Sequence, residues 1–428
     1  MREEDPDVLI VGGGPSGLAT AIELKKLGVD RVVVVDREDS LGGVPRHTHH
    51  SGYGLRDLHH VMSGPAYATR YIEQARQSGV VLMSETAVYA FSDDGCLFST
   101  SPSGLTRWCP KAIVLATGCR ERPRPAHLVA GQRGAGIFTT GSLQQAADLY
   151  HLPIGKRAVI VGTEHVSFSA VHTLSRHGVA VVAMVTKHPR IQSYRLLQLL
   201  TATRAGARIL RGCDVREIRG YPRVSAVEIE NRTTGDRRVI DCDTVVFTGD
   251  WVPDNELVRL GGVEISPASL APNVDQEFRT TRRGVFAVGN LVHPAESADI
   301  AALSSRSVAE SVHRYIKSGY WPSEELTIEL EPPLRWVQPC RISFPALALP
   351  SGRLILRSDR FVGPGYLELW QGEKCIYREA KRPLIPNRSI SFGPRVTDIR
   401  ADHGPIRIRF QSRVPRVLCH GQPGNPWT

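Results

Sequence analysis

Residues 7–17 have the sequence Asp-Val-Leu-Ile-Val-Gly-Gly-Gly-Pro-Ser-Gly. The aliphatic run before the glycines is short and unbroken, which predicts a strand buried in a parallel sheet. Residues 18–27 carry apolar side chains at helical spacing and predict a helix that ends at Gly28. A second aliphatic strand over 31–35 then ends at Asp36. The sequence therefore predicts a strand–turn–helix–strand unit with a carboxylate at its end.

The spacing of the glycines is typical of a turn that binds a dinucleotide. Gly12 permits the tight turn, Gly14 lets the backbone approach a pyrophosphate, and Gly17 lets the helix lie close to the strand. The N–H groups at the start of the helix attract phosphates, and Asp36 can accept a hydrogen bond from a ribose hydroxyl. The alternative is a tight turn without a ligand; the strand before it, the helix after it and the acid beyond it favour a nucleotide site.

The same order of elements recurs in weaker form further along the chain. Residues 156–161 predict a strand, 162–167 a turn, and 179–185 a second strand after a helical stretch. An apolar strand that ends in Ala-Thr-Gly at 116–118 follows the first unit, and one that ends in Thr-Gly at 248–249 follows the second. We therefore expect two related α/β halves.

The turn of the second unit departs from the nucleotide-binding pattern. Gly162 is retained, but Glu164 and Ser167 take the places of the second and third glycines. A carboxylate at a helix N-terminus is itself favoured there, so Glu164 can fill the site that phosphates need. The following strand ends near Lys187, a cation that could accept a 2′-phosphate. We therefore expect the second unit to bind NADPH weakly, or to bind no pyridine nucleotide at all.

The C-terminal part of the chain has a different character. The stretches 353–357, 366–370 and 406–410 alternate apolar and polar residues and predict antiparallel strands of a small all-β domain. Residues 331–428 contain 16 basic and 7 acidic residues, whereas residues 1–330 contain 37 and 36, so the tail holds most of the net charge of +10. Because these cations form no dense run, we expect no nucleic-acid binding. A solvated surface, or one that docks a partner or another copy of the chain, fits this charge better.

Length and composition exclude several classes of protein. The 428 residues suffice for two or three domains, and no aliphatic stretch approaches the ~18 residues of a membrane helix, so no membrane span is expected. The acidic start of the chain is unlike a secretory signal, which predicts a cytoplasmic protein. The eight cysteines include no C-x-x-C pair, so we expect reduced thiols, no disulfide framework, and no zinc or iron–sulfur site.

Residues 1–320 together resemble the flavoproteins with two dinucleotide-binding domains, the superfamily that includes the pyridine nucleotide-disulfide oxidoreductases. The resemblance implies an α/β fold of two Rossmann-like domains, one inserted in the other, followed here by the small C-terminal all-β domain. It implies an FAD-binding domain of residues 1–150 and 251–325, a NAD(P)-binding-like domain of 151–250, and a basic C-terminal domain of 331–428. The residues that it assigns to FAD are Gly12, Gly14, Pro15, Ser16, Gly17, Asp36, Arg37, Gly43, Val88, Ala116, Thr117, Gly118, Gly289 and Asn290.

Several departures narrow the resemblance. In the disulfide reductases a glycine pair leads into two cysteines beside the flavin, but Pro45 and His50 hold those positions here, so no redox disulfide is expected. Residues 42–55 resemble instead FAD-dependent oxidoreductases of glycerol-3-phosphate, opine, proline and hydroxyproline dehydrogenase systems, in which such a chain can be one subunit beside a second flavoprotein. Many of those relatives have a cysteine in place of Thr48. Asn290 stands where aspartate is usual, and its amide can still hydrogen-bond the ribityl chain.

The histidines after the glycine pair are candidate catalytic residues. The resemblance places His47, His49 and His50 near the flavin ring, where a neutral imidazole could shuttle a proton, and favours His50 because it replaces a flavin-proximal cysteine. The alternatives are imidazoles that only hydrogen-bond the loop, and a metal site. No metal is expected, because no Asp, Glu or Cys accompanies them at ligand spacing. A helix that starts near residue 296 would direct its N-terminus at the flavin.

Three functions are consistent with the sequence. We expect an FAD-dependent oxidoreductase, with FAD as the carrier of the redox chemistry. It would be either a flavin subunit that relays electrons for a partner dehydrogenase or a stand-alone enzyme that oxidises NAD(P)H. The electron donor would then be a partner flavoprotein or a small molecule. The third function is a flavin-free binding module on a Rossmann scaffold.

Overall fold

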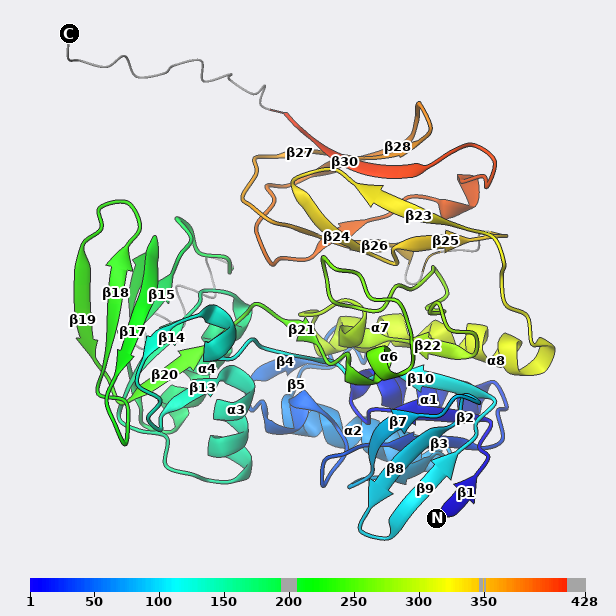
Figure 1. The fold of residues 1–428 in the computed structure, drawn as a ribbon, viewed down its shortest axis with the longest axis horizontal. Coiled ribbons are helices and arrows are strands. Elements are labelled where there is room, and N and C mark those ends of the chain that lie inside the picture. Colours follow the sequence, from blue (N-terminus) through cyan, green and yellow to red (C-terminus); the bar gives the residue numbers. More distant parts are fainter. Residues whose placement is uncertain (194–205, 346–348, 350–351, 414–428) are drawn as a thin grey trace.

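A buried parallel sheet carries the glycine turn. The computed structural model describes residues 1–193, 206–345, 349 and 352–413 (Figure 1). The strands next to the turn are buried, as expected for a parallel sheet that is covered on both faces, and every pairing in this sheet is parallel. Their order across the sheet is β22 (Val285–Ala287), β10 (Ala112–Leu115), β2 (Val8–Val11), β3 (Val32–Val35) and β6 (Val81–Met83).

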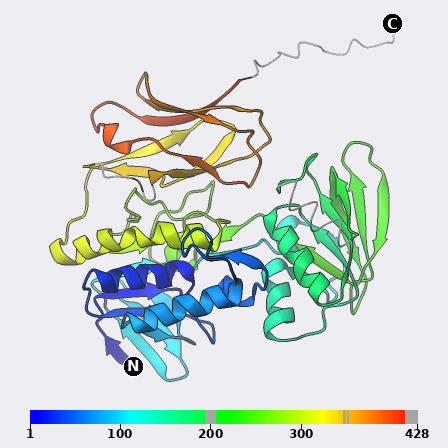
Figure 2. The same cartoon turned by 180° about the vertical axis from the view of Figure 1, so that it is seen from behind.

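Helices cover one face of this first sheet (Figure 2). The predicted helix after the glycines is confirmed as α1 (Pro15–Lys26). The helix expected to start near residue 296 begins at Ala298 and is followed by a second helix, and the two join at Ser307. Both members of the pair pack on α1, and α1 also packs on α2. The remaining bounds are α2 (Gly64–Gln77), α7 (Ala298–Arg306) and α8 (Val308–Ser318).

A second parallel sheet holds the weaker glycine turn. It lies beside the first sheet, in the green part of the ribbon in Figure 1. The predicted second unit is confirmed in order: a strand, the turn, a helix and a strand. Its strands run β13 (Ile137–Thr139), β20 (Thr244–Phe247), β14 (Arg157–Val161), β15 (Ala180–Thr186) and β16 (Arg208–Arg211), with α3 (Thr140–Gln144), a π-helical turn η3 (Gln145–Leu149) and α4 (His165–Arg176).

The chain leaves the first sheet and later returns to it. The outgoing and returning segments pair as the short antiparallel strands β11 (Cys119–Arg120) and β21 (Val252–Pro253). After the return, α6 (Glu256–Leu260) precedes β22, which completes the first sheet beside β10. The apolar core of that sheet accordingly draws on residues 8–116 and again on 257–312.

Two smaller sheets flank the parallel ones, and one of them contains a disulfide. Cys96 and Cys109 are bonded, with their Cα atoms 4.5 Å apart. The expectation that all cysteines are reduced is wrong for this pair, because the antiparallel pairing of β8 with β9 brings the residues at the two ends of the hairpin together. The strands of these sheets are β1 (Arg2–Glu4), β9 (Gly104–Trp108), β8 (Leu97–Ser101) and β7 (Ala87–Phe91), and then β12 (Ala130–Gly131), β17 (Cys213–Arg219), β18 (Ala226–Asn231) and β19 (Arg237–Asp241).

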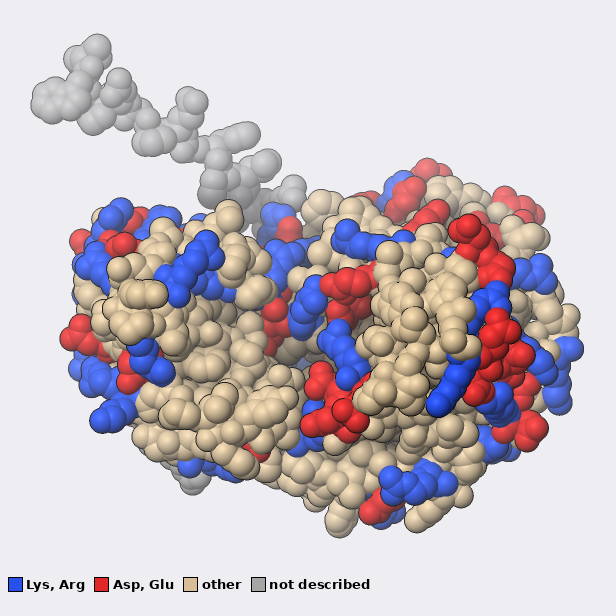
Figure 3. Space-filling model, turned by 60° about the horizontal axis from the view of Figure 1, so that its bottom comes forward, with Lys and Arg blue, Asp and Glu red and all other residues tan. Residues whose placement is uncertain are grey.

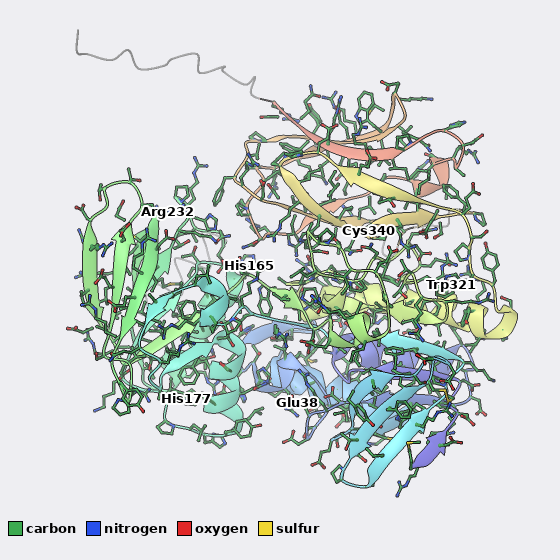
Figure 4. The ribbon with its side chains drawn as sticks, in the orientation of Figure 1. Glu38, His165, His177, Arg232, Trp321 and Cys340 are labelled. Atoms are coloured by element: carbon green, nitrogen blue, oxygen red, sulfur yellow. A yellow bond between two sulfur atoms is a disulfide. The ribbon has the colours of Figure 1, made fainter. Side chains whose placement is uncertain are left out.

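The C-terminal strands form two sheets around a core of their own, at the top of Figure 1. The three stretches predicted as strands are β26, β27 and β30; most pairings are antiparallel, and β23 with β30 is parallel. Cys340, labelled in Figure 4, marks where these sheets meet the rest of the chain, because its backbone N–H donates to Val274 O at 3.1 Å. The bounds are β23 (Glu325–Leu330), β24 (Leu334–Gln338), β25 (Arg341–Ser343), β26 (Leu354–Ser358), β27 (Gly365–Gln371), β28 (Lys374–Lys381), β29 (Ile390–Phe392) and β30 (Ile406–Ser412).

The loop after the glycine pair is irregular. It contains the 3₁₀ turn η1 (Val44–His47) and a short hairpin of β4 (Ser51–Tyr53) with β5 (Met62–Ser63). Residues 59 and 60 lie in a bend between these two strands, and His59 has a positive φ of 54°. Among the helices of the described ranges, none is long and apolar enough to span a membrane.

Candidate functional site

The first glycine turn has the shape of a phosphate cradle. A Cβ atom at Gly12 would collide with Ala116 O, and one at Gly17 would collide with Gly12 O, so only glycine fits both positions. A Cβ at Gly14 would meet only the Cα of Gly43, at 3.8 Å. The turn therefore leaves open space next to Gly14, where a pyrophosphate can approach the backbone.

The start of α1 favours an anion at this place. Its N-cap is Gly14, and within the described chain no side chain caps the helix and no acid lies in its first turn. The free N–H groups and the helix dipole therefore present partial positive charge to the open space. Pro15 and Ser16 form the first turn, and Ser16 packs so closely on Gly289 that a Cβ there would collide with its hydroxyl. The predicted residues 14–17 and 289 thus lie together.

Asp36 holds the turn at the end of β3. Its Oδ2 accepts a hydrogen bond from Gly13 N at 2.6 Å and its Oδ1 accepts one from Glu38 N at 2.9 Å. Burial raises the pKa of Asp36, whereas these two hydrogen bonds lower it. Carboxylate lone pairs are left for a ribose hydroxyl. Arg37, next in the chain, is exposed and pairs with Asp254 at 3.0 Å.

The other residues assigned to FAD surround the same edge of the first sheet. Thr117 Oγ1 donates to Asp254 O at 2.7 Å, and Gly118 O accepts from Asp254 N at 2.9 Å, so the end of β10 is tied to the returning chain. Val88 is half-buried on β7 and packs on the core of the first sheet. It follows Thr86, whose N–H donates to the carbonyl of Asp36 at 2.8 Å.

Asn290 holds the loop that precedes α7. Its Nδ2 donates to Glu296 O at 3.0 Å, and its Oδ1 accepts from Glu296 N at 3.1 Å. In the first turn of α7, Asp299 accepts hydrogen bonds from Gly54 N and Arg56 N, both at 2.9 Å. The helix start therefore also fixes the loop that follows the histidines.

The three candidate histidines do not form one group. His47 is buried, and neither ring nitrogen has a hydrogen-bond partner among the described residues. Burial lowers the pKa of His47 to about 4, so its ring is neutral and enclosed. His49 is exposed, whereas the His50 ring stacks on Tyr53 with centroids 5.3 Å apart. Of the three, His50 is the one whose ring is both partly exposed and held by a neighbouring side chain.

Residues from the second unit reach this loop, and sequence reasoning missed them. Thr48 Oγ1 contacts Gln144 Oε1 at 3.1 Å, and Gln144 Nε2 donates to Ser169 Oγ at 2.9 Å. His172 of α4 meets the ring of His50 edge-on, with centroids 6.3 Å apart. No sequence signal links these residues, because about 100 positions or more separate them from the loop.

The carboxyl group of Glu164 fills the corresponding space in the second unit. Its Oε2 accepts hydrogen bonds from Ser167 Oγ at 3.0 Å and from Thr248 Oγ1 at 3.2 Å. A Cβ at Gly162 would lie 2.6 Å from Oε2, and one at Gly249 would lie 2.7 Å from Oε1. Burial raises the pKa of Glu164. The side chain thus occupies the gap next to both glycines.

Charged groups outside the two glycine turns form no metal site among the described residues. Lys187 is exposed beyond β15 and lies 3.9 Å from Asp250 Oδ2. In the part of the chain that the structure describes, no three His, Cys, Asp or Glu side chains are grouped so that they could hold a metal ion. On the face shown in Figure 3, Lys and Arg side chains are interspersed with Asp and Glu.

Comparisons with known proteins agree with this geometry. The family model for pyridine nucleotide-disulphide oxidoreductases matches residues 6–314. The ferredoxin–NADP reductase of Ignicoccus hospitalis is 24% identical over 332 residues, which cover 74% of this chain and 99% of that one. The sarcosine oxidase subunit alpha of Corynebacterium sp. (strain P-1) is 27% identical over 263 residues, 58% of this chain and 26% of that one. The solved structure of T. acidophilum thioredoxin reductase has a TM-score of 0.62 at 20% identity and covers 74% of this chain and 100% of that one.

The fold and the first glycine turn define an α/β dinucleotide-binding protein. The chain belongs to the pyridine nucleotide-disulphide oxidoreductase family. It is an FAD-dependent oxidoreductase, and the open cradle next to Gly14 fits the pyrophosphate of that cofactor.

Proposed function

We propose that this chain is a flavin subunit that relays electrons for a partner dehydrogenase and does not reduce its own flavin efficiently with NAD(P)H. The observation that carries the proposal is the side chain of Glu164, which fills the gap next to Gly162 and Gly249 where a second dinucleotide would place its phosphates. A relative is itself named as a subunit of sarcosine oxidase. The branch of dehydrogenase subunits that the loop at 42–55 resembles supports the same assignment.

The proposal includes a division into domains. Residues 1–120 and 252–324 would bind FAD, residues 121–251 would form the degenerate nucleotide-binding domain, and the strands from Glu325 onward the C-terminal β domain. The return of β22 to the first sheet and the shared core of 8–116 with 257–312 support a discontinuous first domain. The expected boundary at 150 is moved to about 120, because β13 and α3 belong to the second sheet and its core. The start of the C-terminal domain is moved to Glu325, because β23 pairs within the C-terminal sheets. The separate apolar core of the C-terminal strands supports the third domain.

Bound FAD would supply hydride and electron transfer at its isoalloxazine ring. On the protein side, the α1 N-terminus would hold the pyrophosphate next to Gly14, and Asp36 would accept a hydrogen bond from the adenosine ribose. Asn290 and the N-terminus of α7 would border the ribityl chain and the pyrimidine edge. His50 would hold or move a proton next to Tyr53, whose own pKa is raised to about 12 by burial. His47 is not proposed as a proton carrier, because its ring nitrogens are enclosed.

The chemistry would not use a redox disulfide. Pro45 and His50 stand at the two positions that would hold the flavin-proximal cysteines. The disulfide of Cys96 with Cys109 belongs to the β8–β9 hairpin and not to the sheet that carries the glycine turn. Electrons would therefore pass directly between the flavin and its donor or acceptor.

A stand-alone NAD(P)H oxidoreductase is the second candidate, and one observation favours it. Lys187 is exposed at the end of β15, where a 2′-phosphate would bind, with Arg190 exposed three residues later. If the side chain of Glu164 turned away, NADPH would be the preferred nucleotide. A flavin-free binding module is not proposed, because the chain is an FAD-dependent oxidoreductase.

Anaerobic titration of the purified flavoprotein tests the relay. Candidate amine and hydroxy-acid substrates would be added to the chain alone and to the chain with a dehydrogenase subunit that co-purifies with it. We expect bleaching of the flavin band by substrate only when the partner is present. Equal bleaching by substrate without the partner would contradict the relay.

A further inference from the structure

An arginine from the C-terminal strands is inserted next to the proposed FAD site. Arg357 of β26 donates from Nη2 to Glu296 Oε1 at 2.6 Å and to Pro294 O at 3.2 Å. The two charged side chains are 5% and 3% exposed, so the ion pair is buried. The guanidinium carbon lies 5.0 Å from the ring centre of Trp336, which packs it in place.

The contacts of Arg357 lie on both sides of Ala295, whose backbone conformation is unfavourable in free energy. Ala295 lies between Pro294 and Glu296 and has a φ of +69°. The left-handed region is unfavourable for a residue that has a Cβ atom, and such a residue stays there only when its surroundings hold it. The guanidinium group of Arg357 hydrogen-bonds the residues on both sides of Ala295.

The loop that Arg357 contacts, residues 290–297, leads from Gly289 to α7. Gly289, at its start, packs on Ser16 in the first turn of α1. The side-chain amide of Asn290 hydrogen-bonds both the N–H and the carbonyl of Glu296 across this loop, and α7 begins at Ala298. A shift of the loop would therefore move both the Asn290 amide and the N-terminus of α7.

We propose that Arg357 is a positioning residue for FAD: the C-terminal strands hold the loop of residues 290–297 in the conformation that FAD binding needs. Arg357 lies beyond residue 314, where the match to the family model ends, so this contribution comes from a part of the chain that the family model does not contain. The inference rests on FAD binding at the first glycine turn. It gives the C-terminal strands a role within the chain, in addition to any docking of a partner.

The test is FAD titration of the apoprotein of Arg357→Lys and of the full wild-type chain. Lysine keeps the positive charge next to Glu296, but one ammonium group cannot reproduce the planar fork. We expect the Kd for FAD to rise about tenfold. Amide hydrogen exchange of residues 291–297 in the apoprotein should become faster, while exchange in the C-terminal strands stays unchanged.

Arg341→Lys is the matched control. Arg341 is also buried in the C-terminal sheets and also reaches the first part of the chain, where its Nη2 donates to Asn273 O at 3.3 Å and to Arg279 O at 3.2 Å. Within the described residues its side chain hydrogen-bonds Glu325, Asn273 and Arg279, and none of these belongs to the loop of 290–297. We expect its Kd for FAD to match that of the wild type.

A second substitution separates loop positioning from general stability. Glycine adopts a positive φ without the cost that alanine carries, so Ala295→Gly should restore most of the FAD affinity that Arg357→Lys loses. An Arg357→Lys protein that binds FAD within about twofold of the wild type would overturn the inference. Equal losses in Arg341→Lys would also overturn it, because they would assign the effect to domain docking. A wild-type apoprotein that takes up no FAD would refute the cofactor assignment itself.

Discussion

Gly14 and Glu164 occupy equivalent positions in the two halves of the chain. Each is the N-cap of the helix that follows its glycine turn, and their φ, ψ angles are −77°, −176° and −78°, 178°. The backbone is therefore the same, and the difference lies in one side chain. Gly14 borders open space, whereas the carboxyl group of Glu164 fills the corresponding space. This difference explains why one half is suited to a pyrophosphate and the other is not.

Gly14→Glu should abolish FAD binding while the apoprotein still folds. The extended backbone at this position suits any residue, and a Cβ has room, so the carboxylate would sit at the helix N-terminus as Glu164 does. Flavin absorbance per protein, together with circular dichroism, measures both effects. Gln77→Glu adds one negative charge at the exposed end of α2 and serves as the control. Full flavin occupancy in Gly14→Glu would assign the cofactor to a different place.

Glu121 should make the protein less stable as the pH rises. Its carboxyl group is buried, with Oε2 accepting from Gly141 N at 2.8 Å, and burial raises its pKa from 4.5 to about 7. The folded state thus binds the proton more tightly, so this contribution is fully present below pH 4.5 and is lost as the pH rises through about 7. At about 1.4 kcal/mol per pKa unit, the loss is on the order of 3 kcal/mol.

Urea unfolding of Glu121→Gln at pH 5 and pH 8 measures this contribution. The amide cannot ionise, so we expect the variant to show a smaller decrease in the free energy of unfolding between the two values than the wild type. Glu310→Gln, at an exposed carboxyl group of α8, should leave the wild-type decrease unchanged. Parallel curves for Glu121→Gln and the wild type would mean that the Glu121 carboxyl group is not held protonated by burial.

Much of the fold follows from local sequence, whereas the contacts that complete the site do not. The run before Gly12 and the helix after it are confirmed because each is a short-range pattern with a backbone requirement of its own. The pairing of Arg357 with Glu296 and that of Thr48 with Gln144 join residues 61 and 96 positions apart, and no period in the sequence encodes them.

The histidines show the same limit within a short stretch. Their spacing suggests one cluster, but His47 is buried at the end of the 3₁₀ turn of Val44–His47, whereas His49 is exposed beyond it. The spacing of Cys96 and Cys109 does not predict their disulfide, because the two residues come together only through the register of the β8–β9 hairpin. Orientation at this scale is set by packing, which the sequence pattern alone does not describe.

His47 should oppose Glu121 in its pH dependence. Burial lowers its pKa from 6.5 to about 4, so the folded state binds the proton less tightly than the unfolded state. Stability is therefore lost as the pH falls from 6.5 towards 4, by on the order of 3 kcal/mol. His47→Phe keeps a flat ring and removes the titrating group. Between pH 7.5 and pH 4.5, its free energy of unfolding should therefore decrease less than that of the wild type. His60→Gln, at an exposed histidine, is the control, and identical acid sensitivity of His47→Phe and the wild type would refute the assignment.

We infer that the first half holds FAD and that Glu164 blocks a second nucleotide in the other half. Anaerobic stopped-flow mixing of the flavoprotein with sub-millimolar NADPH or NADH tests it most directly, with Glu164→Gly and Glu164→Gln measured beside the wild type. We expect no flavin bleaching within seconds for the wild type or for Glu164→Gln, whose side chain still fills the gap, and measurable bleaching by NADPH for Glu164→Gly. Bleaching of the wild-type flavin within seconds would contradict the claim.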